Sequence, residues 1–104
     1  MTLNIFGKQV RVIKKKNLGE DAGTDHVLAG YYDPTNSVIA IDESLVRDEY
    51  YHTLVHEIVH AVLHRTGVVQ SRLSMDVHEI ICENIATALT ENFKLTKKKE
   101  VSKR

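Results

Sequence analysis

The stretch LVHEIVHAVLH, residues Leu54–His64, decides the fold because it carries a helical repeat of histidines inside an apolar segment. Together with His52, histidines recur at every fourth position, and at about 100° per residue they share one side of a helix with Glu57. The rest of the circumference is apolar and comprises Leu54, Val55, Ile58, Val59, Ala61, Val62 and Leu63. An apolar arc of this width predicts a helix buried over most of its circumference, with the histidine side lining a cleft.

Cap residues bound this helix, and a second helix follows it. The first helix should begin at about Ser44 or Asp48 and run to Thr66, because Gly67 is a favoured residue just past a helix C-terminus. Apolar residues at helical spacing return further along the chain and predict another helix from about Met75 to Phe93.

The first half of the chain is typical of short β-strands. β-Branched and aromatic residues gather in four runs between polar or turn residues: LNIFG, QVRVI, HVLAGYY and SVIAID. DPTN, between the last two runs, has hairpin length, and the Gly- and acid-rich stretch Asn17–Asp25 indicates a loop. We therefore expect an α+β fold, in which a small antiparallel sheet of three or four short strands packs against both helices. SVIAID is expected at the sheet edge, where it could hold an extended peptide by strand addition.

Composition limits the classes of protein that the chain can represent. With 104 residues, 42% of them hydrophobic, the chain is long enough for one small domain. We expect that domain over residues 1–93 and a basic tail without regular structure over residues 94–104. Balanced charge predicts no nucleic-acid partner, and there is no run of signal-peptide or membrane-spanning length. The single cysteine, Cys82, favours a reducing compartment, so a cytoplasmic protein is expected.

Residues 56–60 read HEIVH, which matches the HExxH pattern of zinc hydrolases. His56 and His60 lie one helical turn apart, a spacing that lets two imidazole nitrogens reach one Zn²⁺ ion. Glu57 is rotated away from both histidines, so it can flank the metal and take a proton from water as the catalytic base. The other interpretation is a helix whose polar side happens to be rich in histidine.

A catalytic zinc needs a third protein ligand, and the second predicted helix supplies the candidates. Leu63 and Thr66 stand where the metzincin pattern requires glycine and histidine, so that class is excluded. Glu79 borders the apolar arc of the second helix and is the predicted third ligand. Glu83 is turned further toward the polar side, where it could support a ligand histidine from outside the coordination sphere. His64 is expected beside the site or at the surface.

Four tyrosines and one more histidine complete the candidates around this site. His78 lies inside the apolar arc of the second helix, which favours a hydrogen-bonded core histidine over a ligand. Tyr31, Tyr32, Tyr50 and Tyr51 could donate to an oxyanion, although packing roles are the commoner ones for tyrosine.

Residues 30–93 resemble the small gluzincin-type zinc metallopeptidases of the ImmA/IrrE group and their phage-encoded relatives. The resemblance rests on GYYDPTNSVIAID, TLVHEIVHAVLH and HEIICENIA. It implies His56 and His60 as zinc ligands, Glu57 as general base and a downstream glutamate as third ligand. Two departures are Val59, where many members of the group have glycine, and the absence of the usual EANxFA wording.

The sequence thus predicts a zinc-dependent metallopeptidase with Zn²⁺ as its cofactor and a peptide or protein as its substrate. The alternative is a non-catalytic zinc-binding or regulatory module, in which a fourth protein ligand such as His64 or His78 closes the coordination sphere.

Overall fold

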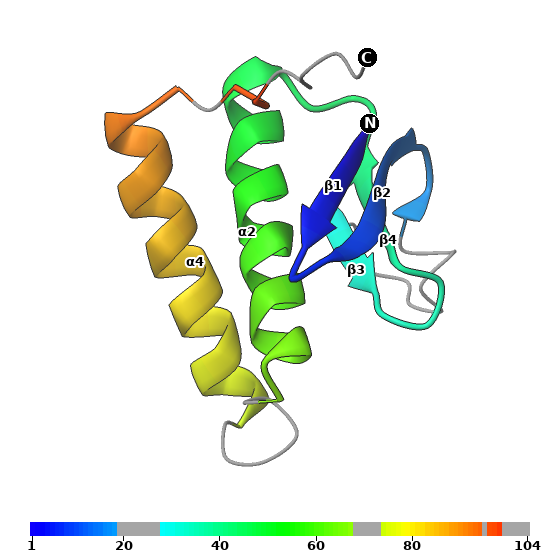
Figure 1. Ribbon diagram of the computed structural model, residues 1–104. Coiled ribbons are helices and arrows are strands. Elements are labelled where there is room, and N and C mark those ends of the chain that lie inside the picture. Colours follow the sequence, from blue (N-terminus) through cyan, green and yellow to red (C-terminus); the bar gives the residue numbers. More distant parts are fainter. Residues whose placement is uncertain (19–27, 68–73, 95, 99–104) are drawn as a thin grey trace.

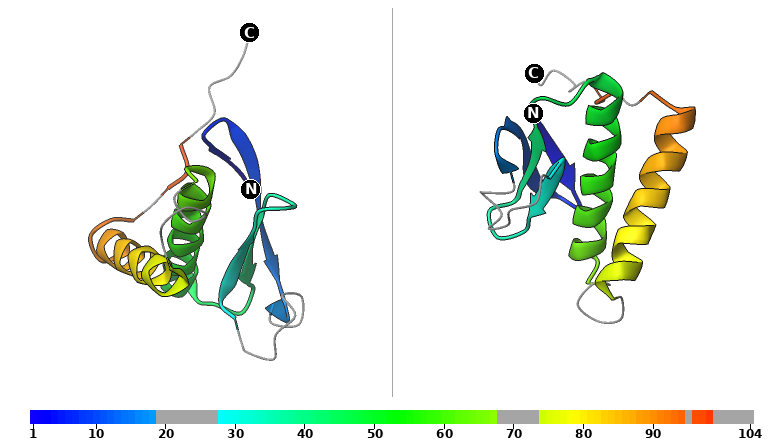
Figure 2. Two further views of the ribbon diagram at one scale, coloured as in Figure 1. Left: turned by 90° about the horizontal axis from the view of Figure 1, so that it is seen from below. Right: turned by 180° about the vertical axis from the view of Figure 1, so that it is seen from behind.

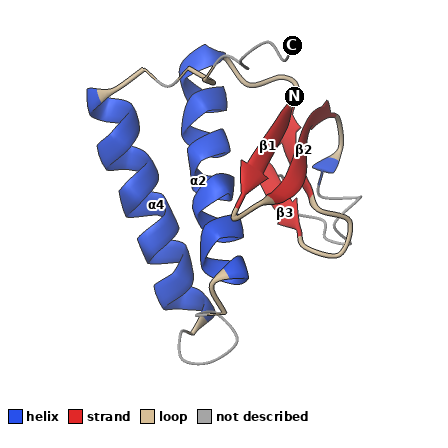
Figure 3. Ribbon diagram, viewed as in Figure 1, coloured by secondary structure: helices blue, strands red, loops and turns tan. Residues whose placement is uncertain are grey.

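The computed structural model describes residues 1–18, 28–67, 74–94 and 96–98. A four-stranded sheet lies on one side of helix α2 (Arg47–Arg65), and helix α4 (Met75–Asn92) lies on the other. Figure 2 shows the same order from two further directions, and Figure 3 shows all strands on one side of α2. The protein is therefore α+β, as predicted, and α2 is the element that contacts both layers.

The sheet has the order β1-β2-β4-β3, with strands β1 (Thr2–Ile5), β2 (Lys8–Lys15), β3 (Gly30–Asp33) and β4 (Val38–Asp42). β1 and β2 form an antiparallel pair, and β3 and β4 form the predicted antiparallel hairpin. β2 and β4 run parallel, from Arg11 opposite Val38 to Lys15 opposite Asp42. The sheet is mixed, so the expectation of a purely antiparallel sheet was wrong.

The position of SVIAID in the sheet corrects a second expectation. β4 pairs with β2 on one side and β3 on the other, so it is a central strand and has no free edge. Four of its five residues, Val38–Ile41, are buried, which is typical of a strand enclosed on both sides. The edge next to the helices belongs to β3 instead, because among the described strands β3 pairs with β4 alone.

Local sequence explains the turns that connect the paired strands. Phe6 and Gly7 both have positive φ, 51° and 79°, which suits the two-residue turn of a tight hairpin between β1 and β2. In the β3–β4 turn, one carboxylate oxygen of Asp33 accepts hydrogen bonds from the backbone N–H groups of Thr35 and Asn36. The Asn36 side chain donates to the other oxygen, and these bonds lower the pKa of Asp33.

The hydrophobic core lies between the sheet and α2. Its buried members are Ile5, Val10, Val12, Ile39, Ile41, Leu54 and Ala61. Burial of these apolar side chains is the main force that holds α2 against the sheet, and it fixes the direction in which the histidine side of α2 points.

Both helices begin and end within a few residues of the predicted positions. The N–H groups of Thr66 and Gly67 donate to the carbonyls of Val62 and His64, and Gly67 has a φ of 77°, as expected for a residue that ends a helix. α4 begins after Ser74, whose hydroxyl accepts a hydrogen bond from the Val77 N–H. Within the ranges that the structure describes, neither α2 nor α4 combines the length and hydrophobicity of a bilayer-crossing helix.

Two other predicted segments lie wholly or partly outside the described residues. The loop predicted over Asn17–Asp25 is described only at its first two positions, and the expected start of the third strand at His26 falls in the same gap. In the basic tail, residues 94 and 96–98 are described; all four are exposed, and none belongs to a helix or strand.

Candidate metal centre

The side of α2 that carries the histidines faces α4. These residues share one side of the helix because they recur at every fourth position. The His56 and His60 side chains are 16% and 13% exposed, so both rings lie in a partly closed environment. Burial also lowers the pKa of His60, which favours the neutral ring that can bind a metal. Packing of α2 and α4 brings Glu79 to the same place from the other helix.

Three donor atoms converge between the helices. The Nε2 atoms of His56 and His60 lie 3.1 Å apart. Oε1 of Glu79 lies 2.7 Å from Nε2 of His60, and its Oε2 lies 3.3 Å from Nε2 of His56. A tetrahedral zinc with bonds of about 2.0–2.1 Å needs donors about 3.3–3.4 Å apart. The donor set therefore fits Zn²⁺, and the largest change needed is an increase of about 0.7 Å in the 2.7 Å separation between His60 and Glu79.

Glu57 lies beside the triangle formed by the donor atoms of His56, His60 and Glu79, and its environment is different. Its carboxylate is within 4.8 Å of donor nitrogens of His56 and His60, and the residue is only 6% exposed. Burial raises the pKa of Glu57 to about 8, and the negative charge of Glu79 adds to the effect. Glu57 therefore holds a proton near neutral pH unless a positive charge nearby favours its carboxylate form.

Glu83 contacts the side of His56 that faces away from the triangle. Its Oε1 lies 2.9 Å from His56 Nδ1, and both of its oxygens lie 3.0 Å from Nε2 of His52. Hydrogen bonds from His52 and then His56 lower the pKa of Glu83. A proton on His56 Nδ1 leaves the Nε2 lone pair free to bind a metal, so Glu83 fixes both the tautomer and the ring orientation.

The structure thus brings all four predicted site residues together, His56, Glu57, His60 and Glu79, with Glu83 in the supporting position expected for it. Comparisons with protein-family models, with curated proteins and with solved structures find no match for this chain. The resemblance to the ImmA/IrrE group stays a prediction, and the functional interpretation rests on the geometry of the site.

His78 and Cys82 border the site from α4 and differ from what the helix pattern suggests. His78 is 4% exposed, but neither ring nitrogen has a hydrogen-bond partner among the described residues. The expectation of a hydrogen-bonded core histidine is therefore not met in that part of the chain. Cys82 is fully buried, and burial raises the pKa of its thiol to about 12, helped by the negative charges of Glu79 and Glu57.

The site opens into a cleft of about 710 Å³ between β3, α2 and α4. Tyr31 and Tyr32 line this cleft, whereas Tyr50 packs against the core and Tyr51 lies outside the cleft. His64 also lines the cleft, with its ring 5.8 Å from that of Tyr32. This position beside the site, outside the triangle of donors, agrees with the sequence expectation for His64.

Gly30 allows β3 to lie close to α2. A Cβ atom at this position would lie 2.7 Å from Thr53 Cγ2 and 3.0 Å from the backbone oxygen of Ala40. Glu57 Cγ would be 3.5 Å away. A side chain here would push β3 away from α2, so the glycine sets the width of the cleft next to Glu57. Sequence reasoning did not identify this residue.

Proposed function

We propose that the protein is a zinc-dependent metallopeptidase of the HExxH type. The observation that carries the proposal is the convergence of His56 Nε2, His60 Nε2 and the Glu79 carboxylate beside a buried glutamate. Two imidazoles and one carboxylate are the ligand set of many catalytic zinc sites, which leave a further coordination position open.

Zinc held by these three residues would supply a Lewis acid that acidifies water and polarises a peptide carbonyl. Glu57 would accept the proton of the attacking water and pass it to the leaving amine. Its carboxylate form is disfavoured by burial, and positive charge nearby favours that form again. Glu57 is thus matched to a proton-transfer role only when the three neighbouring donors carry a cation.

Glu83 and His52 would position the first histidine during this reaction. Glu83 holds His56 by the Nδ1 contact at 2.9 Å, and His52 in turn contacts both oxygens of Glu83. Thr90 Oγ1 lies 3.5 Å from Nδ1 of His52 and borders this chain of contacts. Such a chain limits rotation of the His56 ring, which keeps its Nε2 atom directed at the other donors.

The edge of β3 that no described strand pairs with indicates how a substrate would lie. A peptide segment in extended conformation could add to β3 by main-chain hydrogen bonds, and this would carry it past Glu57. A second hollow, of about 880 Å³, adjoins the cleft through the shared residues Ala29, His52 and Thr53. The substrate class that fits is therefore an unfolded or extended polypeptide with residues on both sides of the scissile bond.

The proposal is tested with the metal-free protein reconstituted with one equivalent of zinc and offered a library of unstructured peptides. We expect cleavage by the parent protein, and about 10²–10⁴-fold slower cleavage by Glu57→Gln with its zinc content preserved. Glu43→Gln is the matched control, because among the described residues the Glu43 side chain forms just an exposed ion pair, with Lys16 at 3.5 Å. Equal cleavage by parent and Glu57→Gln would contradict the role of Glu57. Full zinc occupancy with no cleavage of any peptide would favour the non-catalytic module.

A further inference from the structure

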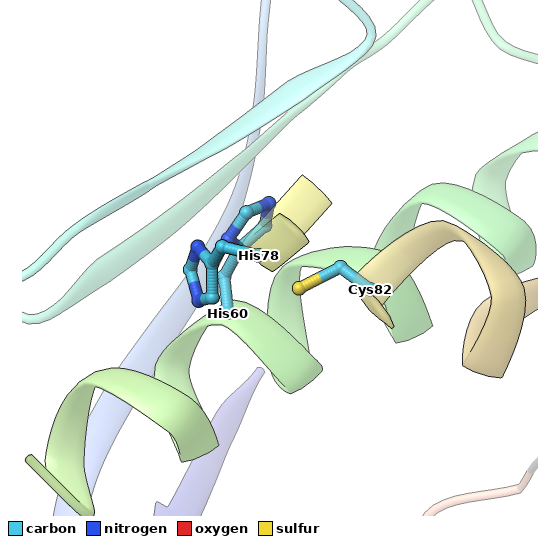
Figure 4. A group of neighbouring side chains, drawn as sticks. All are labelled: His60, His78 and Cys82. Carbon is cyan, nitrogen blue, oxygen red and sulfur yellow. The ribbon is translucent and has the colours of Figure 1, made fainter. Parts of the chain in front are cut away.

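A second group of side chains with metal-binding donor atoms shares His60 with the proposed zinc site. Donor atoms of His60, His78 and Cys82 all lie within 4.8 Å of one another. Figure 4 shows the imidazole rings of His60 and His78 side by side, with the Cys82 sulfur pointing toward them. The ring centroids of the two histidines lie 4.5 Å apart, in an edge-to-face arrangement.

The unpartnered ring nitrogens of His78 indicate that the group of His60, His78 and Cys82 lacks a ligand. Buried polar atoms nearly always have a hydrogen-bond partner, and each exception calls for an explanation. His78 is only 4% exposed, and both of its ring nitrogens are buried without a partner among the described residues. A cation placed between His78 and Cys82 would satisfy one of these nitrogens.

The three side chains offer a softer set of donors than the proposed zinc site does. His56, His60 and Glu79 offer two nitrogens and a hard carboxylate oxygen, whereas the second group offers two nitrogens and a thiolate. Thiolate ligands favour soft or borderline ions such as Cu⁺ and Zn²⁺ over hard ones. When such an ion binds, the Cys82 thiol loses its proton to solvent and a metal–sulfur bond forms.

We propose that His60, His78 and Cys82 form a second metal site, which takes a soft, thiophilic cation and competes with zinc because the two sites share His60. His60 cannot complete both sites with the same nitrogen, and its Nε2 atom already lies 2.7 Å from Glu79. An ion at the thiolate site that binds this same nitrogen therefore withdraws His60 from the carboxylate site. If the protein is the proposed peptidase, a soft cation inhibits it by this route.

An ion could reach this group from solvent, and the three side chains could then close around it. His60 and His78 line the open cleft, so an ion can reach their rings from solvent before it meets the buried sulfur. Donor separations of up to 4.8 Å exceed those of a tetrahedral site, so the side chains must rotate inward when the ion binds. The negative charge of Glu79 nearby favours a cation in this region.

The test uses Cd²⁺ as the thiophilic probe, because a cadmium–thiolate bond produces an ultraviolet charge-transfer band. The metal-free full chain is titrated, and we expect the band to saturate at one equivalent. Cys82→Ala should abolish the band, and His78→Leu should weaken Cd²⁺ binding by more than about tenfold, the lower bound for loss of even an outer-sphere partner. Glu79→Gln, which damages only the carboxylate site, should keep the band. Circular dichroism establishes that each variant is folded.

A second measurement tests the sharing of His60 without any use of peptide hydrolysis. Zinc-loaded protein is mixed with Cd²⁺ in the presence of a chromophoric zinc chelator, and the parent should release zinc faster and more completely than Cys82→Ala. Equal release from both proteins would show that Cd²⁺ acts at the carboxylate site and would overturn the competition. A parent protein without the band, or a band of equal affinity in folded His78→Leu, would overturn the second site itself. Both readouts stand even if the protein cleaves no peptide.

Discussion

Glu79 Oε1 lies 2.7 Å from His60 Nε2, although the two residues are on different helices and lie 19 positions apart in the sequence. The contact joins α2 to α4 at the point where the HExxH pair needs a third ligand. It also separates the roles of two glutamates that stand one turn apart on α4, because Glu83 reaches only the far side of His56.

The first prediction compares these two glutamates. Glu79→Ala removes a donor from the triangle, so zinc affinity should fall well beyond the range that an outer partner accounts for. Glu83→Ala removes only the support of His56 and should weaken zinc binding by about 10–100-fold. Both side chains are 53% exposed, so they form a matched pair for competition titrations with a chromophoric chelator. A larger loss of zinc affinity in Glu83→Ala than in Glu79→Ala would show that Glu83 is the ligand and Glu79 the supporting residue.

The second prediction concerns pH and the metal-free protein. The pKa of Glu57 rises from 4.5 to about 8 on folding, so the folded state binds more protons between these pH values. Stability should therefore fall as pH rises through this window, by at most about 1.4 kcal/mol per pH unit from this group. Glu57→Gln should remove this part of the dependence and make the metal-free protein more stable than the parent at pH 8. Denaturant unfolding at several pH values measures it, and parallel curves for the two proteins would contradict it.

The third prediction tests the close approach of β3 to α2. Gly30→Ala places a Cβ atom 2.7 Å from Thr53 Cγ2, so the strand or the helix must shift. We expect a loss of about 1–3 kcal/mol in the free energy of unfolding, typical of overpacking. Adding Thr53→Ser removes the methyl group and should recover part of this loss, while Thr53→Ser alone should have a smaller effect. No recovery in the double variant would place the strain elsewhere, for example at the Ala40 carbonyl.

The fourth prediction concerns the basic C-terminal tail. Residues 96–98 are exposed and lie outside any helix or strand, and Phe93, just before the tail, is 63% exposed. A chain that ends at Phe93 should therefore keep its melting temperature to within about 4 °C, the shift that roughly 1 kcal/mol produces in a domain of this size. Thermal unfolding followed by circular dichroism checks this, and a much larger drop would show that the tail packs against the domain.

The helices and the residues of the candidate site could be predicted from sequence because helical periodicity is local. The spacing from His56 to His60 fixes their common face, and the position of Glu79 at the border of an apolar arc predicts which glutamate turns inward. Gly67 and Ser74 mark helix ends by backbone chemistry that needs no tertiary context. For these features the local pattern and the packed structure require the same arrangement.

The direction of strand pairing and the state of His78 could not be obtained in the same way. Alternation of apolar residues is the same whether a strand pairs parallel or antiparallel, so β2 gives no sign of its parallel neighbour. The unbroken burial of Val38–Ile41 does have a signature, the continuous apolar run VIAI, and it could have identified β4 as central. A helical wheel predicts that His78 is buried, but it does not show whether a hydrogen-bond partner lies within reach of the ring.

The small number of buried residues on α4 has a consequence for the cooperativity of unfolding. α4 contributes only three buried residues, His78, Cys82 and Ala86, whereas α2 is held by a core shared with the sheet. We therefore expect the sheet and α2 to form the more stable folding unit, and α4 to be the part whose opening costs the least free energy. Each opening would carry Glu79 away and leave a two-histidine fragment. Amide hydrogens of α4 should then exchange faster than those of α2, and an ion bound between the helices should slow the exchange of α4 in particular.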